Sequence, residues 1–114
     1  MKIAATYEKE TGNVFQHFGK TQFFKIYEIQ DGKIISSQII DNGGFGHHDL
    51  VGYLTSLGVQ TLILGNRGQG AIDAIKNGGL TEVPGITGSA DLAAQKFAQG
   101  TLVGNPNARC NHQH

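Results

Sequence analysis

The sequence contains no tryptophan, two prolines and one cysteine among its 114 residues. The single cysteine, Cys110, cannot form an internal disulfide, and a lone thiol suits a reducing compartment. An excess of charge of one sign is also missing, because nine basic and nine acidic residues cancel. Without a basic cluster, the chain lacks the electrostatic footprint that nucleic acid or an anionic membrane surface requires. We therefore expect no nucleic-acid partner and no membrane partner.

Long apolar stretches are absent as well. No run approaches the roughly 18 residues of a membrane span, and Lys2 and Glu8 bring charge before the apolar core of a signal peptide could form. These features predict a soluble, cytoplasmic protein. With 39% hydrophobic residues the chain supports one core. We expect a single domain over residues 1–102 and a flexible polar tail over residues 103–114, which has little apolar surface to bury.

Glycine, in contrast, is abundant, at about twice its usual share of roughly 7%. Residues 43–48 (GGFGHH) join a β-branched run at residues 33–40 to a helix expected to begin near Asp49. Three glycines in four residues leave little bulk between backbone and ligand, and the helix directs its free N–H groups and positive dipole end to the same place. The stretch therefore predicts a site for an anionic, metal-containing ligand. The alternative is a flexible turn with two solvated histidines.

Patterns of apolar residues predict the other elements. Strands are expected at residues 2–7, 23–29, 33–40, 60–65 and 80–83, and helices from Asp49 to Gly58, from Ala71 to Gly78, and from an N-cap at Ser89 to Gly100, the last packing Leu92, Ala93 and Phe97. The Asp31-Gly32 pair predicts a hairpin, which makes residues 33–40 an antiparallel edge strand. Residues 60–65 form a continuous apolar run, which is typical of a strand covered on both faces.

This order of elements predicts an α/β fold with a mixed sheet and helices on both of its faces, because strands joined through helices run parallel. Ligands of such sheets bind at the carboxyl ends of the strands. The two glycine loops, at residues 43–46 and 65–70, both follow strands. We expect them to lie at the same edge of the sheet.

Four segments, in this order and spacing, resemble those of a known family. They are His17-Phe18-Gly19 before the second strand and residues 43–47, 65–71 and 85–88 before the three helices. Over residues 1–102 the chain resembles the dinitrogenase iron–molybdenum cofactor biosynthesis family, which includes nitrogenase accessory proteins and an orange molybdenum–copper cluster protein. The resemblance implies a ribonuclease H-like motif in a three-layer α/β/α arrangement, with a five-stranded mixed sheet of order 3-2-1-4-5 whose strand 2 is antiparallel. It also implies binding of a metal–sulfur cluster or its precursor.

Sequence motifs that are typical of enzymes are absent. Residues 19–21 (GKT) fail the P-loop spacing, because Gly12 lies seven positions before Gly19 and a strand follows. Residues 65–70 fail the dinucleotide spacing. The first strand lacks the carboxylate that two-metal nuclease chemistry needs, and no serine stands on a strand-to-helix elbow. We therefore expect a protein that is not an enzyme.

Histidine and cysteine are the candidate metal ligands. Given the resemblance, His17 and His47 are the best candidates for ligands or hydrogen-bond donors to a cluster, because imidazole binds iron or copper and its N–H can donate to sulfide. The alternative for His17 is a loop histidine satisfied by backbone, and His48 can simply cap the helix. In the tail, Cys110, His112 and His114 place soft and borderline donors at alternate positions, either as a transient capture site or as incidental donors.

The predicted function is that of a small carrier or scaffold for an anionic metal–sulfur cluster, of the iron–molybdenum, molybdenum–copper or iron–sulfur type, which exchanges it with a cluster-assembly or acceptor protein. Arg67 would supply a fixed charge, unless it is a solvated loop residue. Two alternatives are an interaction or regulatory domain of the same fold and, with less support, an enzyme acting on a small phosphorylated metabolite. The expected cluster-binding residues are Gly43, Gly44, Gly46, Arg67, Gly68 and Gly70, and the expected metal ligands are His17, His47, His48, Cys110 and His112.

Overall fold

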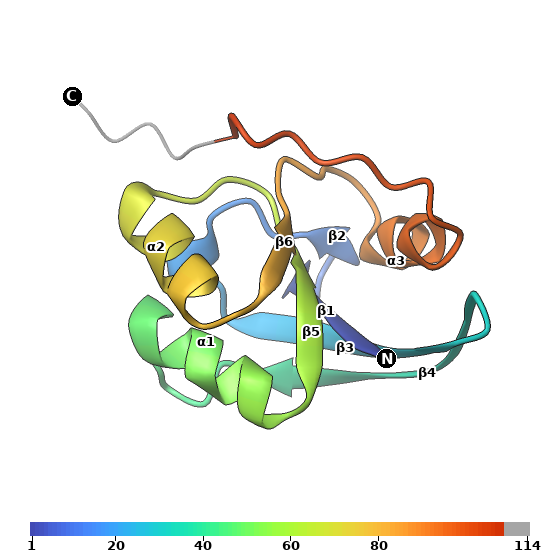
Figure 1. Cartoon of the computed structure of the whole chain (residues 1–114), viewed down its shortest axis with the longest axis horizontal. Coiled ribbons are helices and arrows are strands. Elements are labelled where there is room, and N and C mark those ends of the chain that lie inside the picture. The colour runs from blue at the N-terminus through green and yellow to red at the C-terminus, as the bar shows by residue number, and fades with distance from the viewer. Residues whose placement is uncertain (109–114) are drawn as a thin grey trace.

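The computed structural model describes residues 1–108, without the side chains of His47 and His48. A sheet forms the centre, and helices lie on both of its faces (Figure 1). The elements in chain order are β1 (Lys2–Glu8), β2 (Asn13–Val14), the 3-10 helix η1 (Phe18–Lys20), β3 (Phe23–Gln30), β4 (Lys33–Asp41), α1 (His47–Ser56), β5 (Val59–Ile63), α2 (Gln69–Asn77), β6 (Thr81–Val83) and α3 (Ala90–Ala98). Among the described residues, no helix has the length and apolar character that a membrane crossing needs.

The sheet has the strand order β4-β3-β1-β5-β6, and the short β2 pairs with β1 outside this path. β3 is antiparallel to both of its neighbours, whereas β1, β5 and β6 are parallel. β4 therefore runs in the same direction as β1, β5 and β6. The four carboxyl ends lie at one edge of the sheet, which we call the carboxyl edge. β4 and β6 are the outer strands and β5 lies between two neighbours, as the sequence predicted.

The hairpin between β3 and β4 follows from its turn residues. Asp31 and Gly32 have φ angles of 54° and 74°, and Gln30 pairs with Lys33. Positive φ at both central residues is the mirror-image type I turn, which Asp-Gly adopts readily and which matches the twist of paired strands. The predicted hairpin is confirmed. The register shifts by one residue farther along, where Ile35 has no partner in β3.

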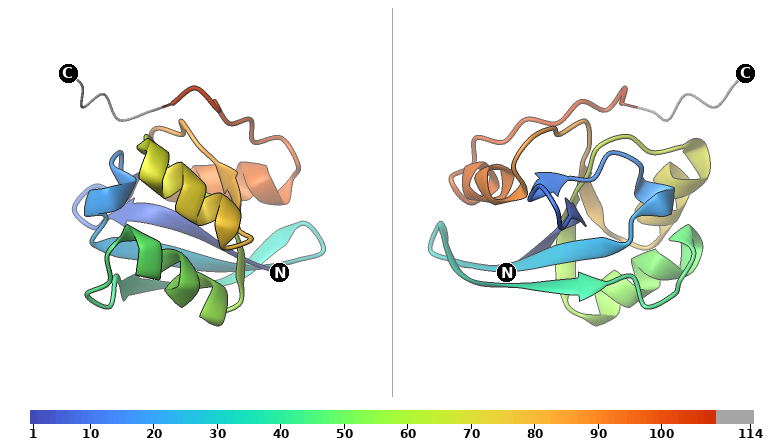
Figure 2. Two further views of the ribbon diagram at one scale, coloured as in Figure 1. Left: turned by 60° about the vertical axis from the view of Figure 1, so that its left-hand side comes forward. Right: turned by 180° about the vertical axis from the view of Figure 1, so that it is seen from behind.

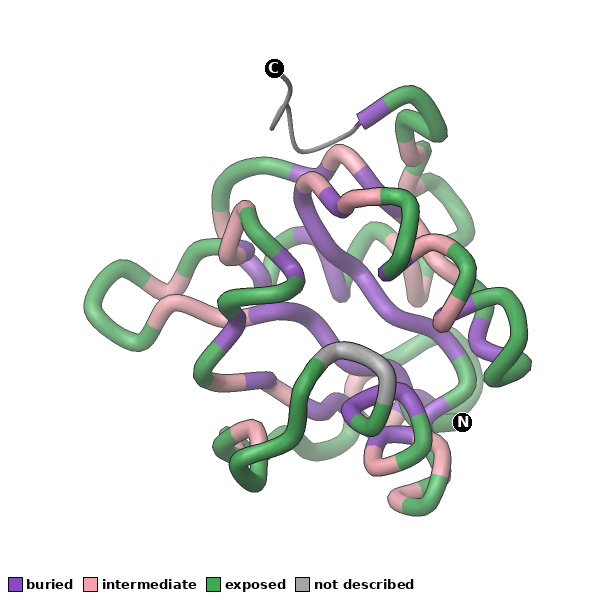
Figure 3. Tube along the Cα trace, turned by 90° about the vertical axis from the view of Figure 1, so that its left-hand side faces the viewer, coloured by how far each residue is buried: buried purple, intermediate pink, exposed green. Residues whose placement is uncertain are grey.

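Two apolar clusters cover the two faces of the sheet. One joins the sheet to α1 and α2 and contains Phe24, Leu54, Leu62 and Ile75. The other joins it to α3 through Ile3, Tyr27, Ile63, Ala90 and Ala94. Seen from behind, α3 lies apart from α1 and α2 (Figure 2), and a trace coloured by burial shows long buried stretches in the interior of the molecule (Figure 3).

Helix α3 differs in one detail from what the sequence predicted. Ser89 caps it as predicted, because its side-chain oxygen accepts a hydrogen bond from the Leu92 N–H. Leu92 itself, which was expected to pack, is 58% exposed. The buried face of α3 consists instead of the small side chains of Ala90, Ala93 and Ala94.

The chain between β1 and β3 is held in place by hydrogen bonds and by one buried aromatic side chain. Val14 donates to the Gly88 carbonyl, and the Thr6 hydroxyl donates to the Phe15 carbonyl at 2.8 Å. Phe18, in η1, is fully buried. This segment therefore forms part of the carboxyl edge.

Residues 104–108, which we call the strap, pack against the loop that follows β6. The Asn105 N–H donates to the Pro84 carbonyl at 2.7 Å, and Ala108 is 9% exposed. A Cβ atom on Gly85 would lie 2.7 Å from the Cβ of Asn105, closer than non-bonded carbons approach. This part of the predicted flexible tail is thus tied to the domain, and residues 109–114 of the tail lie outside the described residues.

Candidate functional site

Four loops gather at the carboxyl edge, because four strands of one direction end there. They follow β1, β4, β5 and β6, and the last three lead into α1, α2 and α3. Both glycine loops of the sequence are among them, as expected. The carboxyl edge of a mixed α/β sheet is the usual place for ligands.

The loop after β4, residues 42–46, faces solvent and is called the open loop. Gly43, Gly44 and Gly46 are exposed. Around Gly44 and Gly46, no atom lies within 4 Å of the place that a Cβ would occupy. Gly46 is the N-cap of α1, with no side-chain hydrogen bond to the helix. Phe45 is 43% exposed and stacks at 5.1 Å between ring centroids on Tyr53.

Part of the hydrogen-bonding capacity of the open loop is already used. The Gly43 N–H donates to the Asp41 carboxylate and the Gly44 N–H to the Asn42 side-chain oxygen, both at 2.9 Å. The donors left at this end of the loop are the N–H groups of the first turn of α1, which have no partner inside the helix. Gly43 and Gly44 thus shape the loop. The backbone of His47 begins α1, but its side chain and that of His48 lie outside the described structure, so their predicted roles stay predictions.

The loop after β5, residues 64–68, is packed against the chain and is called the closed loop. The Asn66 N–H donates to the Gln16 carbonyl at 2.8 Å, and the Phe18 N–H donates to the Asn66 carbonyl at 3.2 Å. A Cβ on Gly65 would lie 2.8 Å from the Cα of Gln16. Gly65 therefore permits close approach of two backbone segments, and it is not an open cradle for a ligand.

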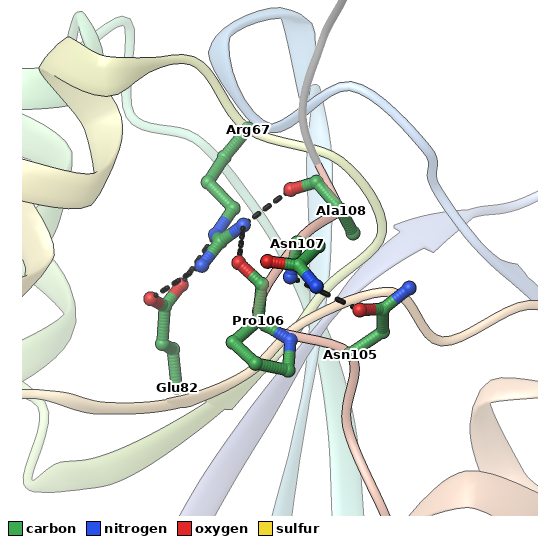
Figure 4. Close-up of polar contacts among 6 residues, drawn as sticks. All are labelled: Arg67, Glu82, Asn105, Pro106, Asn107 and Ala108. Atoms are coloured by element: carbon green, nitrogen blue, oxygen red, sulfur yellow. Dashed lines mark hydrogen bonds and ion pairs between the residues drawn. The ribbon is translucent and has the colours of Figure 1, made fainter.

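Arg67 lies inside the closed loop and is 3% exposed. Its Nε and Nη2 donate to the two carboxylate oxygens of Glu82 at 2.8 and 3.0 Å. Its Nη1 donates to the strap carbonyls of Pro106, at 3.3 Å, and Ala108 (Figure 4). The planar guanidinium suits this two-point contact with a carboxylate. From the sequence, Arg67 was expected to offer a fixed charge to the cluster or to be solvated, whereas the structure directs its charge to the chain's own acceptors.

Gly68 and Gly70 lie at the beginning of α2. Gly68 is its N-cap, with no side-chain hydrogen bond and no atom within 4 Å of the place that a Cβ would take, and Gly70 belongs to the first turn. The N-cap residues of α1 and α2 are therefore both glycines, which have no capping side chain, whereas α3 has Ser89. Uncapped N–H groups at two helix ends leave donors for an anion at this edge.

His17 is exposed and borders a cavity of about 390 Å³ between the segment after β1 and the loop after β6. Glu8, Phe15, Thr87 and Gly88 also line this cavity. The His17 ring meets Phe15 edge-on at 6.3 Å between centroids, and its backbone bridges to Asn66 of the closed loop. His17 thus stands beside two of the loops of the carboxyl edge.

A preformed set of metal ligands is not found in the part of the chain that the structure describes, where no three His, Cys, Asp or Glu side chains are grouped to hold an ion. Cys110 and His112 lie outside the described residues. Their predicted metal binding, like that of His47 and His48, stays a prediction.

Together these features define a small α/β domain whose uncapped helix ends and one histidine-bordered cavity meet at one edge of a mixed sheet. The chain belongs to the family described as dinitrogenase iron-molybdenum cofactor, whose model matches residues 1–100. The family resemblance seen in the sequence is confirmed.

Individual relatives agree with this assignment. An uncharacterized protein of Methanocaldococcus jannaschii, MJ0580, is 30% identical over 107 residues, which are 90% of this chain and 89% of that protein. The crystal structure of PH0822 superposes with a TM-score of 0.83 at 23% identity, covering 96% of this chain and 100% of the other. The apo form of the orange protein from Desulfovibrio gigas gives 0.74 at 22% identity, with 92% of each chain covered. These two structural likenesses concern the fold.

Proposed function

We propose that this protein is a non-enzymatic, cytoplasmic carrier that binds an anionic metal–sulfur cluster, or its precursor, at the carboxyl edge and transfers it to or from an assembly or acceptor protein. Membership of the dinitrogenase iron-molybdenum cofactor family supports the ligand class. The structural observation that carries the proposal is the convergence of two uncapped, glycine-led helix ends and His17 on one edge. We also ascribe the ribonuclease H-like motif to this sheet, on the family resemblance.

The chemistry of such an edge suits a sulfide cluster. Sulfide and thiolate sulfurs accept hydrogen bonds, and N–H groups at a helix end offer donors together with the positive end of the dipole. His17 would bind iron or copper through a ring nitrogen, or donate its N–H to sulfide. Gly44, Gly46 and Gly68, around which a Cβ would meet nothing, leave room for a bulky ligand to approach the backbone.

The identity of the cluster is left open by these residues. Imidazole and backbone donors accommodate iron–molybdenum, molybdenum–copper and iron–sulfur ligands alike. His47 and His48 would complete the contacts at the open loop. Cys110 and His112 would add soft donors for transient capture during transfer.

The test is anaerobic reconstitution with each type of cluster, followed by visible absorption and by metal and sulfide analysis. The double variant H17A/H47A should lose most of the retained cluster while its thermal stability stays almost unchanged, because His17 is exposed and residues at or beside loops bury little apolar area in general. The control is S36A/Q38A, a double change of exposed polar residues on the edge strand β4. Equal retention by parent and H17A/H47A would refute the assigned site. Failure of the parent to retain any cluster would favour a regulatory domain.

A further inference from the structure

A second cavity, of about 450 Å³, lies on the α3 side of the sheet, between α3 and the β3–β4 hairpin. Its lining begins at the hairpin turn, with Gly32 and Lys33, and reaches the end of α3 at Gln99. The turn lies at the end of the sheet opposite to the carboxyl edge, because β4 begins there. This cavity is therefore separate from the candidate cluster site.

The polar groups on the floor of the cavity form hydrogen bonds with one another. The Tyr27 hydroxyl and the Lys25 ammonium both donate to Oδ1 of Asp91, at 2.7 and 2.8 Å. Tyr27 is 1% exposed, and burial together with the bond to Asp91 raises the pKa of its hydroxyl, which keeps it protonated. The bond from Lys25 lowers the pKa of Asp91. The ammonium and the carboxylate cancel, so the floor contributes no net charge.

The walls of the cavity differ from its floor. They carry four polar side chains, those of Lys33, Ser37, Gln95 and Gln99. Within residues 1–108, none of the four side chains has a hydrogen bond or ion pair. Lys33 therefore brings one uncompensated positive charge, and the hydroxyl and two amides bring further donors and acceptors.

We propose that this cavity binds a small organic molecule bearing one carboxylate or one phosphate group. A cation is disfavoured, because Lys25 and Lys33 outnumber the single carboxylate of Asp91, which is already paired. Gln95 and Gln99 are exposed, and a purely apolar ligand that covered their amides would remove hydrogen bonds to water without replacing them. An oxyanion paired with Lys33, with polar groups toward Ser37 and the two amides, satisfies all four wall residues, and the volume is that of an ordinary metabolite site.

The experiment is a titration followed by two-dimensional amide NMR. The probes are lactate, glycerate, ribose 5-phosphate and glycerol 3-phosphate, with glycerol and sodium chloride as neutral and ionic-strength controls. We expect at least one carboxylate or phosphate to cause saturable changes in amide chemical shift that are confined to residues 31–39 and 91–99. Comparison of the carboxylates with the phosphates shows which of the two groups the cavity binds. Shifts only at the carboxyl edge, or none that saturate with any anion, would overturn the proposal.

Two variants locate the charge. K33Q should weaken binding of the responding anion about tenfold, the loss expected for one charge-assisted contact, and K33R should largely restore it. K76Q removes the same charge from the exposed face of α2 and should leave affinity unchanged. Equal affinity of K33Q and parent would contradict the site. All four probes lack metal and sulfide, so the outcome is independent of cluster binding.

Discussion

The open loop and the closed loop both follow a strand, contain glycine and lead into a helix with a glycine N-cap, yet their surroundings are opposite. In the open loop, a Cβ on Gly44 or Gly46 would meet no atom within 4 Å. In the closed loop, Gly65 lies against Gln16, and Arg67 is buried between Glu82 and the strap. Glycine thus leaves free space at Gly44 and Gly46 of the open loop, whereas at Gly65 of the closed loop it permits another segment to pack closely. The open loop is available to a ligand, and the closed loop holds the edge together.

The largest expected effect is that of R67A in the closed loop. It leaves the Glu82 carboxylate, 21% exposed, without its partner and removes the donor to two strap carbonyls. We expect a loss of about 3 kcal/mol in the free energy of unfolding, as for other buried ion pairs that lose one member. Urea denaturation measures it. K76A, an exposed change in the neighbouring helix, should cost less than about 0.5 kcal/mol, and similar losses for both variants would contradict the buried role of Arg67.

Alanine at one glycine of each loop compares the loops directly. G65A places a Cβ 2.8 Å from the Gln16 Cα, so the backbone must shift, and we expect a loss of about 2 kcal/mol. Gly46 has a φ of −75° and open space around it, so G46A should cost no more than about 1 kcal/mol, mainly as a poorer N-cap. Thermal unfolding of the two variants checks the order. A greater loss of thermal stability for G46A than for G65A would contradict the description of residues 42–46 as the open loop and residues 64–68 as the closed loop.

Truncation tests how the strap contributes to the closed loop. Removing residues 105–114 takes two acceptors from Arg67, and we expect a loss of about 1–2 kcal/mol. Removing residues 109–114 keeps both acceptors and should cost clearly less. A flexible tail, as the sequence predicted, would instead cause almost no loss in the longer deletion, because it would bury little apolar surface. Equal stability of the two truncated proteins would show that residues 105–108 do not stabilise the domain.

The smallest effect belongs to Asp91, whose ion pair with Lys25 is more exposed than that of Arg67. Asp91 is 56% exposed, and hydrogen bonds from Lys25 and then Tyr27 lower its pKa from the ordinary 3.8. A depressed folded-state pKa contributes stability above 3.8 that is lost as the pH falls through the folded value. The stability difference between the parent and D91N should therefore shrink as the pH falls below 3.8. A difference independent of pH in urea titrations would show that Asp91 acts through packing alone.

Local chemistry made part of the fold predictable. The Asp31-Gly32 turn, the Ser89 cap and the apolar run of β5 each depend on residues adjacent in the chain, and all three are present. The two-residue strand β2 escaped prediction because two residues carry no periodic pattern. The prediction that Leu92 packs in the core was wrong, because the buried residues of α3 are alanines and not this larger residue.

The candidate site was less predictable, because its decisive contacts join distant residues. Arg67 meets Glu82 15 residues away and Ala108 41 residues away, and nothing near Arg67 in the sequence indicates either partner. Gly65 and Gly44 both lie in glycine-containing loops of the sequence. The contact of Gly65 with Gln16, which distinguishes the two positions, is visible only in the structure. The glycine loops and His17 could be placed at one edge from strand directions, whereas which loop is open required the three-dimensional contacts.

The tight hairpin between β3 and β4 has a consequence for the order of folding. Its strands pair across a two-residue turn, whereas the parallel pairing of β1 with β5 joins residues more than 50 positions apart, such as Ile3 and Thr61. Short loops close with little loss of chain entropy and hairpins form within microseconds. The hairpin should therefore already be formed in the folding transition state. G32A, which strains a residue at φ 74°, should slow refolding by nearly the whole factor by which it lowers stability and leave the unfolding rate almost unchanged.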